Sequence, residues 1–229
     1  MKLRNPLKCL GKFDYILWGV SVFSILCSFL LVSERDYLTL CASLIGVSAL
    51  IFVAKGHIFG QILVVIFAIF YGIISFFFSY YGEMITYLLM SAPMAVCAII
   101  SWAKNPYGNT SQVKVHTPSR RQIIIMLSLS VLVTIAFYFI LGALGTASLI
   151  VSTVSVLTSF IASYLTFMRS PYYAIAYALN DIILIVLWVL ASIKDISQAP
   201  MVACFVMFFL NDLYGFICWK RMQRAQASK

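Results

Sequence analysis

The sequence predicts an all-α, polytopic membrane protein with eight transmembrane helices. Of its 229 residues, 63% are hydrophobic and 10% are charged, and the mean hydropathy is +1.01. A soluble domain of this size would need more charged side chains to cover its surface. The apolar residues also come in runs of about 20, the length that crosses a bilayer as a helix. The lipid bilayer is therefore the predicted environment of nearly the whole chain.

The runs place the helices in order along the chain. We expect spans over 14–33, 37–54, 56–79, 83–103, 123–141, 146–168, 172–194 and 198–220. The first follows the basic stretch MKLRNPLKCLGKFD, but its apolar core is too long for a signal peptide and lacks a small-residue cleavage site. It is read as a retained helix, and the polar segment 104–122 as a cytoplasmic linker.

The net charge of +9 is a topology signal rather than a sign of nucleic-acid binding. With the N-terminus inside, fourteen of the sixteen Lys and Arg residues fall in cytoplasmic segments, and only Arg35 and Lys194 fall outside. Such a bias is the positive-inside pattern of membrane proteins. It predicts that the N- and C-termini are both cytoplasmic.

Two parts of the chain repeat one pattern. AIISWAKN (98–105) parallels GFICWKRM (215–222), and LIFVAKGHIFG (50–60) parallels YLTFMRSPYYA (164–174). Each repeat is a triplet of three helices, and one helix lies between the two triplets, so both triplets cross the membrane in the same direction. In transporters, such a parallel repeat places the substrate near the membrane midplane, between the two triplets. The predicted units are an N-terminal extra helix (1–36), a first three-helix repeat (37–104), a linker with a connecting helix (105–145), a second repeat (146–222) and a cytoplasmic tail (223–229).

Acidic residues are scarce, and most are expected where water solvates them, at helix ends or in loops: Asp14, Glu34, Asp36, Glu83 and Asp195. Only Asp181 and Asp212 fall well inside predicted spans, where a charge costs at least about 2.5 kcal/mol. Counted from the cytoplasmic ends of their helices, both lie at roughly 12–14 Å depth. The two Asn-Asp pairs at 180–181 and 211–212 are therefore predicted to lie at the same depth in the membrane.

Each pair belongs to a helical stripe with aromatic residues at its ends. The stripes are Tyr177, Asn180, Asp181, Leu184 and Trp188, and Phe208, Asn211, Asp212, Gly215 and Trp219. Aromatic planes beside amide and carboxylate groups suit a flat, polar, cationic heterocycle that carries hydroxyls. The structural alternative is that Asn and Asp bond neighbouring helices and only hold the bundle together.

Other polar residues give weaker signals. Gln61, Tyr71, Tyr87, Thr86 and Ser91 are candidates in the first triplet, and Gly72 and Pro93 indicate close packing or a kink. Trp102 and Trp219, each followed by Lys, are read as interfacial belt residues. The six cysteines and the two histidines, His57 and His116, show no metal-ligand or disulfide spacing. No cofactor and no metal is predicted.

Taken together, NDIILIVLW (180–188), FLNDLYGFICW (209–219) and YYGEMITYLLMSAPMAVCAIISWAKNP (80–106) resemble the PnuC family of bacterial vitamin transporters over about 37–222. The resemblance implies an inner-membrane homotrimer that admits nicotinamide riboside, or thiamine or riboflavin in related branches, by facilitated diffusion with trapping by a kinase. It also implies a small-molecule site with Asn180 and Trp188 on the substrate helix. Asp181 and Tyr177 share their stripe, Asn211, Asp212 and Tyr214 are neighbours, and Gln61, Tyr71 and Tyr87 are candidates from the first triplet.

Three other functions compete with this one. A proton-coupled symporter would use Asp181 or Asp212 as its proton carrier. An intramembrane enzyme would need a nucleophile with its base, or a metal cluster, and no such motif is present. A substrate-binding subunit of an ATP-driven importer typically has fewer helices and no repeat. A non-enzymatic transporter is therefore the predicted class.

Overall fold

The structure is a computed structural model that describes residues 6–32, 36–78, 80–146 and 148–228. Within these ranges, eight helical segments are long and apolar enough to cross a membrane. They are α1 (Lys12–Leu31), α2 (Tyr37–Ala54), α3 (Ile58–Phe77), α4 and α5 together (Tyr81–Lys104), α6 (Arg120–Ala143), α7 (Leu149–Phe167), α8 (Tyr173–Lys194) and α9 (Ala199–Ala227). The all-α prediction with eight spans is confirmed. The expectations for Glu34 and Arg35 concern residues outside the described ranges.

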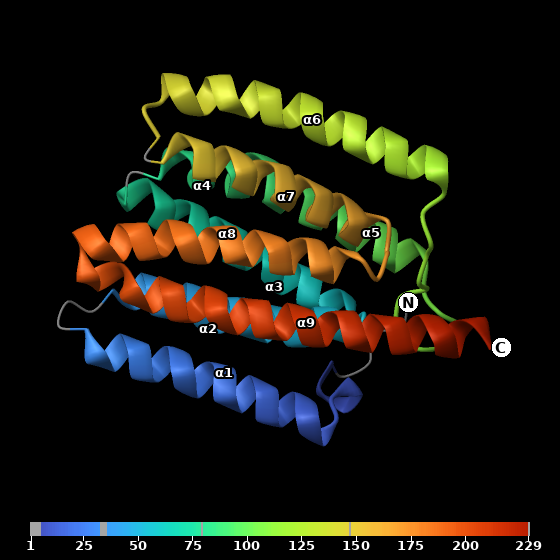
Figure 1. Cartoon of the computed structure of the whole chain (residues 1–229). Helices are drawn as coiled ribbons and strands as arrows, with labels where there is room; N and C mark the ends of the chain where they lie inside the picture. Colours follow the sequence, from blue (N-terminus) through green and yellow to red (C-terminus); the bar gives the residue numbers. More distant parts are fainter. Residues whose placement is uncertain (1–5, 33–35, 79, 147, 229) are drawn as a thin grey trace.

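The helices run side by side along one direction (Figure 1). α6 lies at one edge of the bundle, where it packs on α7, and α1 lies at the opposite edge against α2 and α9. Between these edges α2 packs on α9 and α5 packs on α7. The two predicted triplets therefore meet along two helix pairs, and α1 and α6 flank them.

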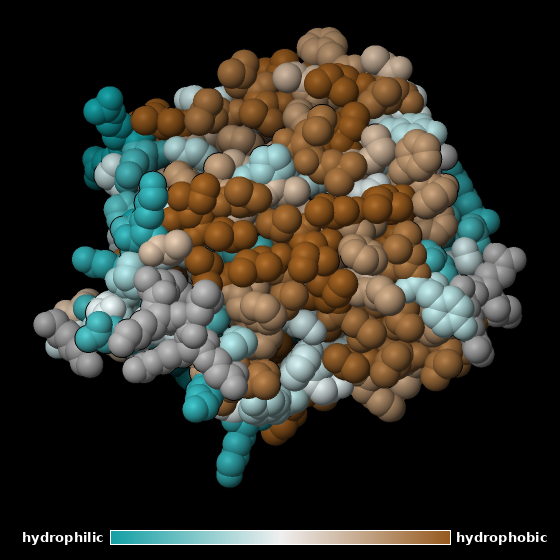
Figure 2. All heavy atoms as spheres, turned by 180° about the vertical axis from the view of Figure 1, so that it is seen from behind, coloured by the Kyte–Doolittle hydropathy of each residue, from teal (hydrophilic) through white to brown (hydrophobic). Residues whose placement is uncertain are grey.

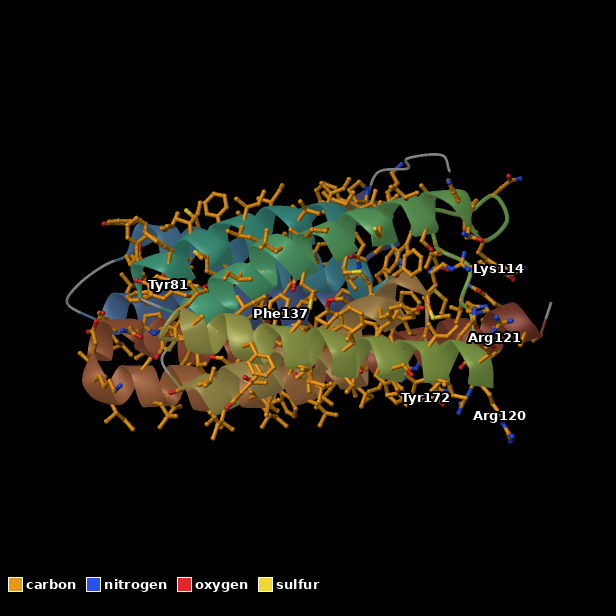
Figure 3. All side chains as sticks on the ribbon, turned by 90° about the horizontal axis from the view of Figure 1, so that it is seen from above. Tyr81, Lys114, Arg120, Arg121, Phe137 and Tyr172 are labelled. Carbon is orange, nitrogen blue, oxygen red and sulfur yellow. The ribbon has the colours of Figure 1, made fainter. Side chains whose placement is uncertain are left out.

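Both chain termini lie at one end of the bundle, called here the termini end (Figure 1). Lys114, Arg120 and Arg121 are at this end, and Tyr81 is at the opposite, far end (Figure 3). The back of the molecule is covered by apolar side chains in its middle, and hydrophilic ones gather most densely at the termini end (Figure 2). An apolar band between polar ends is the surface that a bilayer-spanning bundle needs.

The fourth span is interrupted halfway. α4 (Tyr81–Ile85) is followed by a π-helical segment, Thr86–Ser91, and then by α5 (Ala92–Lys104). Pro93 explains the break because it has no N–H to donate to the preceding turn. Gly72 packs closely there, since a Cβ on it would meet Leu88 Cγ at 2.6 Å.

The turns after α2 and α7 have the same geometry. Gly56 and Arg169 both have a left-handed backbone conformation, with φ of 63° and 61°. In each turn the N–H of the following residue donates to a carbonyl of the preceding helix: His57 N–H to Phe52 O at 3.0 Å, and Ser170 N–H to Leu165 O at 2.9 Å. The linker joins both turns through Val113 N to Gly56 O and His116 N to Arg169 O.

Trp102 and Trp219 lie in the core and not at the lipid interface, which corrects the prediction of belt residues. Each indole N–H donates to a carbonyl in the other triplet: Trp102 to Thr166 O at 3.0 Å and Trp219 to Val53 O at 2.9 Å. Their rings also touch, with centroids 5.4 Å apart. We propose that the triplets are parallel repeats, because such a repeat would produce this reciprocal exchange.

Trp219→Phe is expected to destabilise the protein measurably. The ring volume is largely kept, but the buried Val53 carbonyl loses the indole N–H and keeps the Gly56 N–H at 2.9 Å, so the loss is that of one hydrogen bond, about 0.5–1.5 kcal/mol. The readout is the midpoint of thermal unfolding in detergent. Trp18→Phe is the control, because Trp18 bonds the part-buried Ser48 hydroxyl, which keeps its own bond to Leu44 O. Equal midpoints for the Trp219 variant and wild type would contradict a stabilising role of the indole bond between the two triplets.

Two acids that were expected in water are buried. Asp36 and Asp195 do lie at helix ends, where they accept N–H groups of Leu38 and Ser197. Asp14, however, is 1% exposed and Glu83 is 0% exposed. Asp14 is covered because α1 packs against α2 and α9. Glu83 is covered because the turn that contains it packs on α7 and on the end of α6.

Candidate functional site

A cavity of about 60 Å³ lies between the two triplets. It is bounded by α2, α3, the π-helical segment, α7, α8 and α9, so all six helices of the triplets contribute and α1 and α6 supply none of its lining residues. Most lining atoms are apolar. The polar side chains are Gln61, Tyr87, Ser91, Ser159, Tyr173, Tyr177, Asn180, Asp181 and Asp212.

Six of the ten predicted site residues line this cavity: Gln61, Tyr87, Tyr177, Asn180, Asp181 and Asp212. The other four, Tyr71, Trp188, Asn211 and Tyr214, are not among its lining residues. The structure therefore brings together one amide and two carboxylates from α8 and α9 with a glutamine and a tyrosine from the first triplet.

Asn180 is held in a fixed orientation by hydroxyl groups of α7. Its Oδ1 lies 2.8 Å from Thr158 Oγ1, 3.0 Å from Ser159 Oγ and 3.3 Å from Ser155 Oγ. Within the described residues its Nδ2 makes no hydrogen bond, and the side chain lines the cavity. The amide can therefore present two N–H donors to a bound ligand.

Asp181 and Asp212 lie beside each other at the cavity wall, one from α8 and one from α9. Each is only 3% exposed. Asp181 Oδ2 has no hydrogen-bond partner among the described residues, and no Lys or Arg lines the cavity. Two desolvated carboxyls without a cation form an electrostatic environment that favours a positively charged ligand.

Aromatic rings form the wall of the cavity toward the far end. Phe67 contacts Tyr87 and Phe208 with ring centroids 5.9 and 5.2 Å away. Behind this wall Trp188 Nε1 donates to Tyr71 Oη at 2.8 Å, and the Tyr71 ring lies 4.2 Å from that of Tyr87. Trp188 and Tyr71 thus support the lining rings without reaching the cavity.

The remaining two predicted residues are bound by α1. Asn211 Nδ2 donates to Ser21 Oγ at 3.0 Å and to Met207 O at 2.7 Å. Tyr214 Oη donates to Asp14 Oδ1 at 2.6 Å. Asn211 and Asp212 are adjacent and so point about 100° apart on a helix, which sends one side chain to α1 and the other into the cavity.

The sequence reasoning missed a stripe of hydroxyls on the buried face of α7. Five side chains are spaced by three or four residues and are all buried: Ser152, Ser155, Ser159, Ser163 and Thr166. Ser159 lines the cavity, and Ser163 Oγ lies 3.0 Å from Tyr177 Oη. The spacing in SLIVSTVSVLTSFIASYLTF is visible in the sequence and could have been found.

In this conformation the cavity is too small for a vitamin-sized ligand, because such ligands occupy sites of about 300–1,000 Å³. Phe208 fills space next to Gly46, where a Cβ would meet its ring at 2.2 Å. Ligand entry therefore requires the lining helices to move apart or the Phe208 ring to rotate. The break in the fourth span lies beside the cavity, at Tyr87 and Ser91.

Metal-ligating residues do not gather at this site. The described residues contain no group of three or more His, Cys, Asp and Glu side chains that could hold a metal ion. His57 instead caps α3, where its Nδ1 accepts the Phe59 N–H at 3.2 Å.

Comparison with known proteins gives this geometry its context. The profile of a family described as nicotinamide mononucleotide transporter matches residues 36–221. The nicotinamide riboside transporter PnuC of Neisseria mucosa is 27% identical over 199 residues, which are 85% of this chain and 76% of that protein. A crystal structure of the vitamin B3 transporter PnuC superposes with a TM-score of 0.82 at 25% identity, covering 95% of this chain and 94% of that one. The resemblance to PnuC is confirmed, and the chain belongs to the nicotinamide mononucleotide transporter family of multi-pass membrane transporters.

Proposed function

We propose that this protein takes up nicotinamide riboside across the bacterial inner membrane by facilitated diffusion, with phosphorylation inside the cell trapping the ligand. The cavity chemistry supports this substrate. Nicotinamide riboside combines a cationic pyridinium, a carboxamide and ribose hydroxyls. Asp181 and Asp212 supply negative charge without a protein cation, and Asn180 supplies free amide donors. The relative named for this substrate adds support from outside the chain.

Each part of the ligand has a matching surface in the cavity. The carboxyl pair would neutralise the pyridinium, and the rings of Phe67, Tyr87 and Phe208 offer faces for stacking. Asn180 and Gln61 would bond the carboxamide or the ribose, because amides donate and accept. A monovalent cation balances one carboxylate, and the other carboxyl of the pair can keep a proton throughout, so transport needs no accompanying proton.

The orientation of the protein follows from its charges. The termini end carries Lys114, Arg120 and Arg121 (Figure 3), together with the basic residues of α9 beyond Trp219. We assign this end to the cytoplasm because positively charged segments stay inside. The homotrimer implied by family resemblance is part of the same proposal.

A binding titration of the detergent-purified protein with nicotinamide riboside, thiamine and riboflavin tests the substrate. We expect saturable binding of nicotinamide riboside. Asn180→Ala should weaken it by about 10-fold or more, since losing a buried hydrogen bond costs about 1–3 kcal/mol. Asn109→Ala, in the exposed linker, is the matched control and should bind normally. Binding of thiamine or riboflavin alone would contradict the substrate and keep the family.

The symporter alternative rests on the same two carboxyls, because a proton on Asp181 or Asp212 could also balance them. It predicts uptake that stops when an uncoupler collapses the proton gradient. Facilitated diffusion predicts initial rates that the uncoupler leaves unchanged.

A further inference from the structure

Glu83 is a buried carboxylate that the cavity does not account for. It lies in the first turn of α4, at the far end of the molecule, and is 0% exposed. Neither carboxyl oxygen makes a hydrogen bond of standard length and angle within the described residues, although the Ser155 hydroxyl lies close enough to interact with it. No ion pair joins Glu83 to a Lys or Arg within that part of the chain. A charge held this way in a membrane-spanning segment is expensive, so the acid is neutral until a cationic ligand compensates its charge.

Three tyrosine hydroxyls lie in the neighbourhood of this carboxyl. Tyr71, Tyr80 and Tyr87 all lie within electrostatic reach of Glu83. The Tyr80 ring packs on Trp188 with centroids 5.3 Å apart. A single acid with tyrosine and tryptophan side chains nearby is the kind of group that binds an organic monovalent cation.

One hydroxyl connects Glu83 with the cavity. Ser155 lies beside the Glu83 carboxyl, and its Oγ is 3.3 Å from Asn180 Oδ1. Ser155 belongs to the buried hydroxyl stripe of α7, which continues through Ser159 at the cavity to Ser163. Polar groups therefore run without a break from Glu83 to the amide in the cavity.

We propose that Glu83 is a second binding position for the cationic part of the substrate. It lies on the far side of the aromatic wall of Phe67, Tyr87 and Phe208 from the cavity. The inference rests on the proposed function and adds a route to it. The pyridinium pairs with Glu83 first and then moves past Tyr87 to Asp181 and Asp212. The hydroxyls of α7 exchange hydrogen bonds with the ribose along the way.

The charge of the ligand is the property that tests this second binding position. Nicotinamide riboside and its reduced 1,4-dihydro form share the carboxamide and the ribose, but only the oxidised form is a cation. Uptake of each is measured in proteoliposomes containing wild type, Glu83→Gln or Asp195→Asn. Asp195 is the matched control, because it is an exposed acid in the loop after α8.

We expect Glu83→Gln to lower the ratio of oxidised to reduced riboside uptake by about 10-fold or more, and Asp195→Asn to leave it unchanged. Glu83→Asp keeps the charge and should preserve most of the ratio, which covers the case that the Gln variant does not fold. An equal loss of uptake for both ligands in Glu83→Gln, or no loss for either, would overturn the proposal of a second binding position. So would a Glu83→Gln variant that changes only the pH dependence of uptake, which would make Glu83 a proton site. Wild-type protein that takes up neither riboside would contradict the proposed function itself.

Discussion

Replacing Asp181 or Asp212 by asparagine is expected to weaken nicotinamide riboside binding by at least about 10-fold, because a carboxylate about 4 Å from a cation contributes several kcal/mol at the effective dielectric constant of a protein. The two carboxyls lie side by side in a wall without cations, so they are the charges available to a pyridinium there. Removing both should reduce binding further than either alone. Affinity is measured by calorimetry on the purified variants.

The neutral ligand and a distant acid provide the controls. Reduced nicotinamide riboside should bind the asparagine variants about as well as it binds wild type, because it carries no positive charge. Asp195→Asn should bind both ligands like wild type. If Asp181→Asn and Asp212→Asn both kept full affinity for the oxidised riboside, the assignment of the carboxyl pair to the cation would be wrong.

Removing Asp14 is expected to have the largest effect on stability. Its Oδ1 pairs with Lys55 Nζ at 2.8 Å and accepts the Tyr214 hydroxyl at 2.6 Å, while Oδ2 accepts the Gly11 N–H. Asp14 is 1% and Lys55 18% exposed. Asp14→Ala leaves the Lys55 ammonium without its carboxylate and, among the described residues, with only the Tyr214 hydroxyl at 3.1 Å and Cys218 beside it, and breaking a buried pair in this way costs about 3–5 kcal/mol. Partial exposure of Lys55 places the loss at the lower end of this range.

A charge reversal separates pairing from other losses. Asp14→Lys alone should unfold at a markedly lower temperature, and Asp14→Lys combined with Lys55→Asp should recover part of the midpoint. Measured unfolding midpoints in detergent decide this. A stable Asp14→Ala variant would contradict the role of this ion pair as the main polar attachment of α1.

The sequence predicted the fold well because its signals are long. Runs of about 20 apolar residues identify spans without any knowledge of packing. Equal depth on two helices likewise placed Asp181 and Asp212 together, and both line the cavity. A helical stripe is wide, however, so the pattern could not tell that Asp212 faces the cavity while Asn211 faces Ser21 of α1.

Other features depend on contacts between distant segments. Trp102 followed by Lys has the pattern of an interfacial residue, and only its bond to Thr166 O shows that it lies in the core. Glu83 sits near the start of a span, where water usually reaches, but the start of α7 and the end of α6 cover its turn. The hydroxyls of α7 were overlooked because Ser and Thr in membrane helices often bond only their own backbone.

Uptake of radiolabelled nicotinamide riboside into proteoliposomes, without an ion gradient or ATP, tests the central claim most directly. The account predicts saturable uptake that stops when the internal concentration equals the external one. It also predicts that adding an uncoupler changes nothing and that unlabelled riboside competes. Accumulation above the external concentration that requires a proton gradient, or a flux no greater than that of protein-free liposomes, would contradict it.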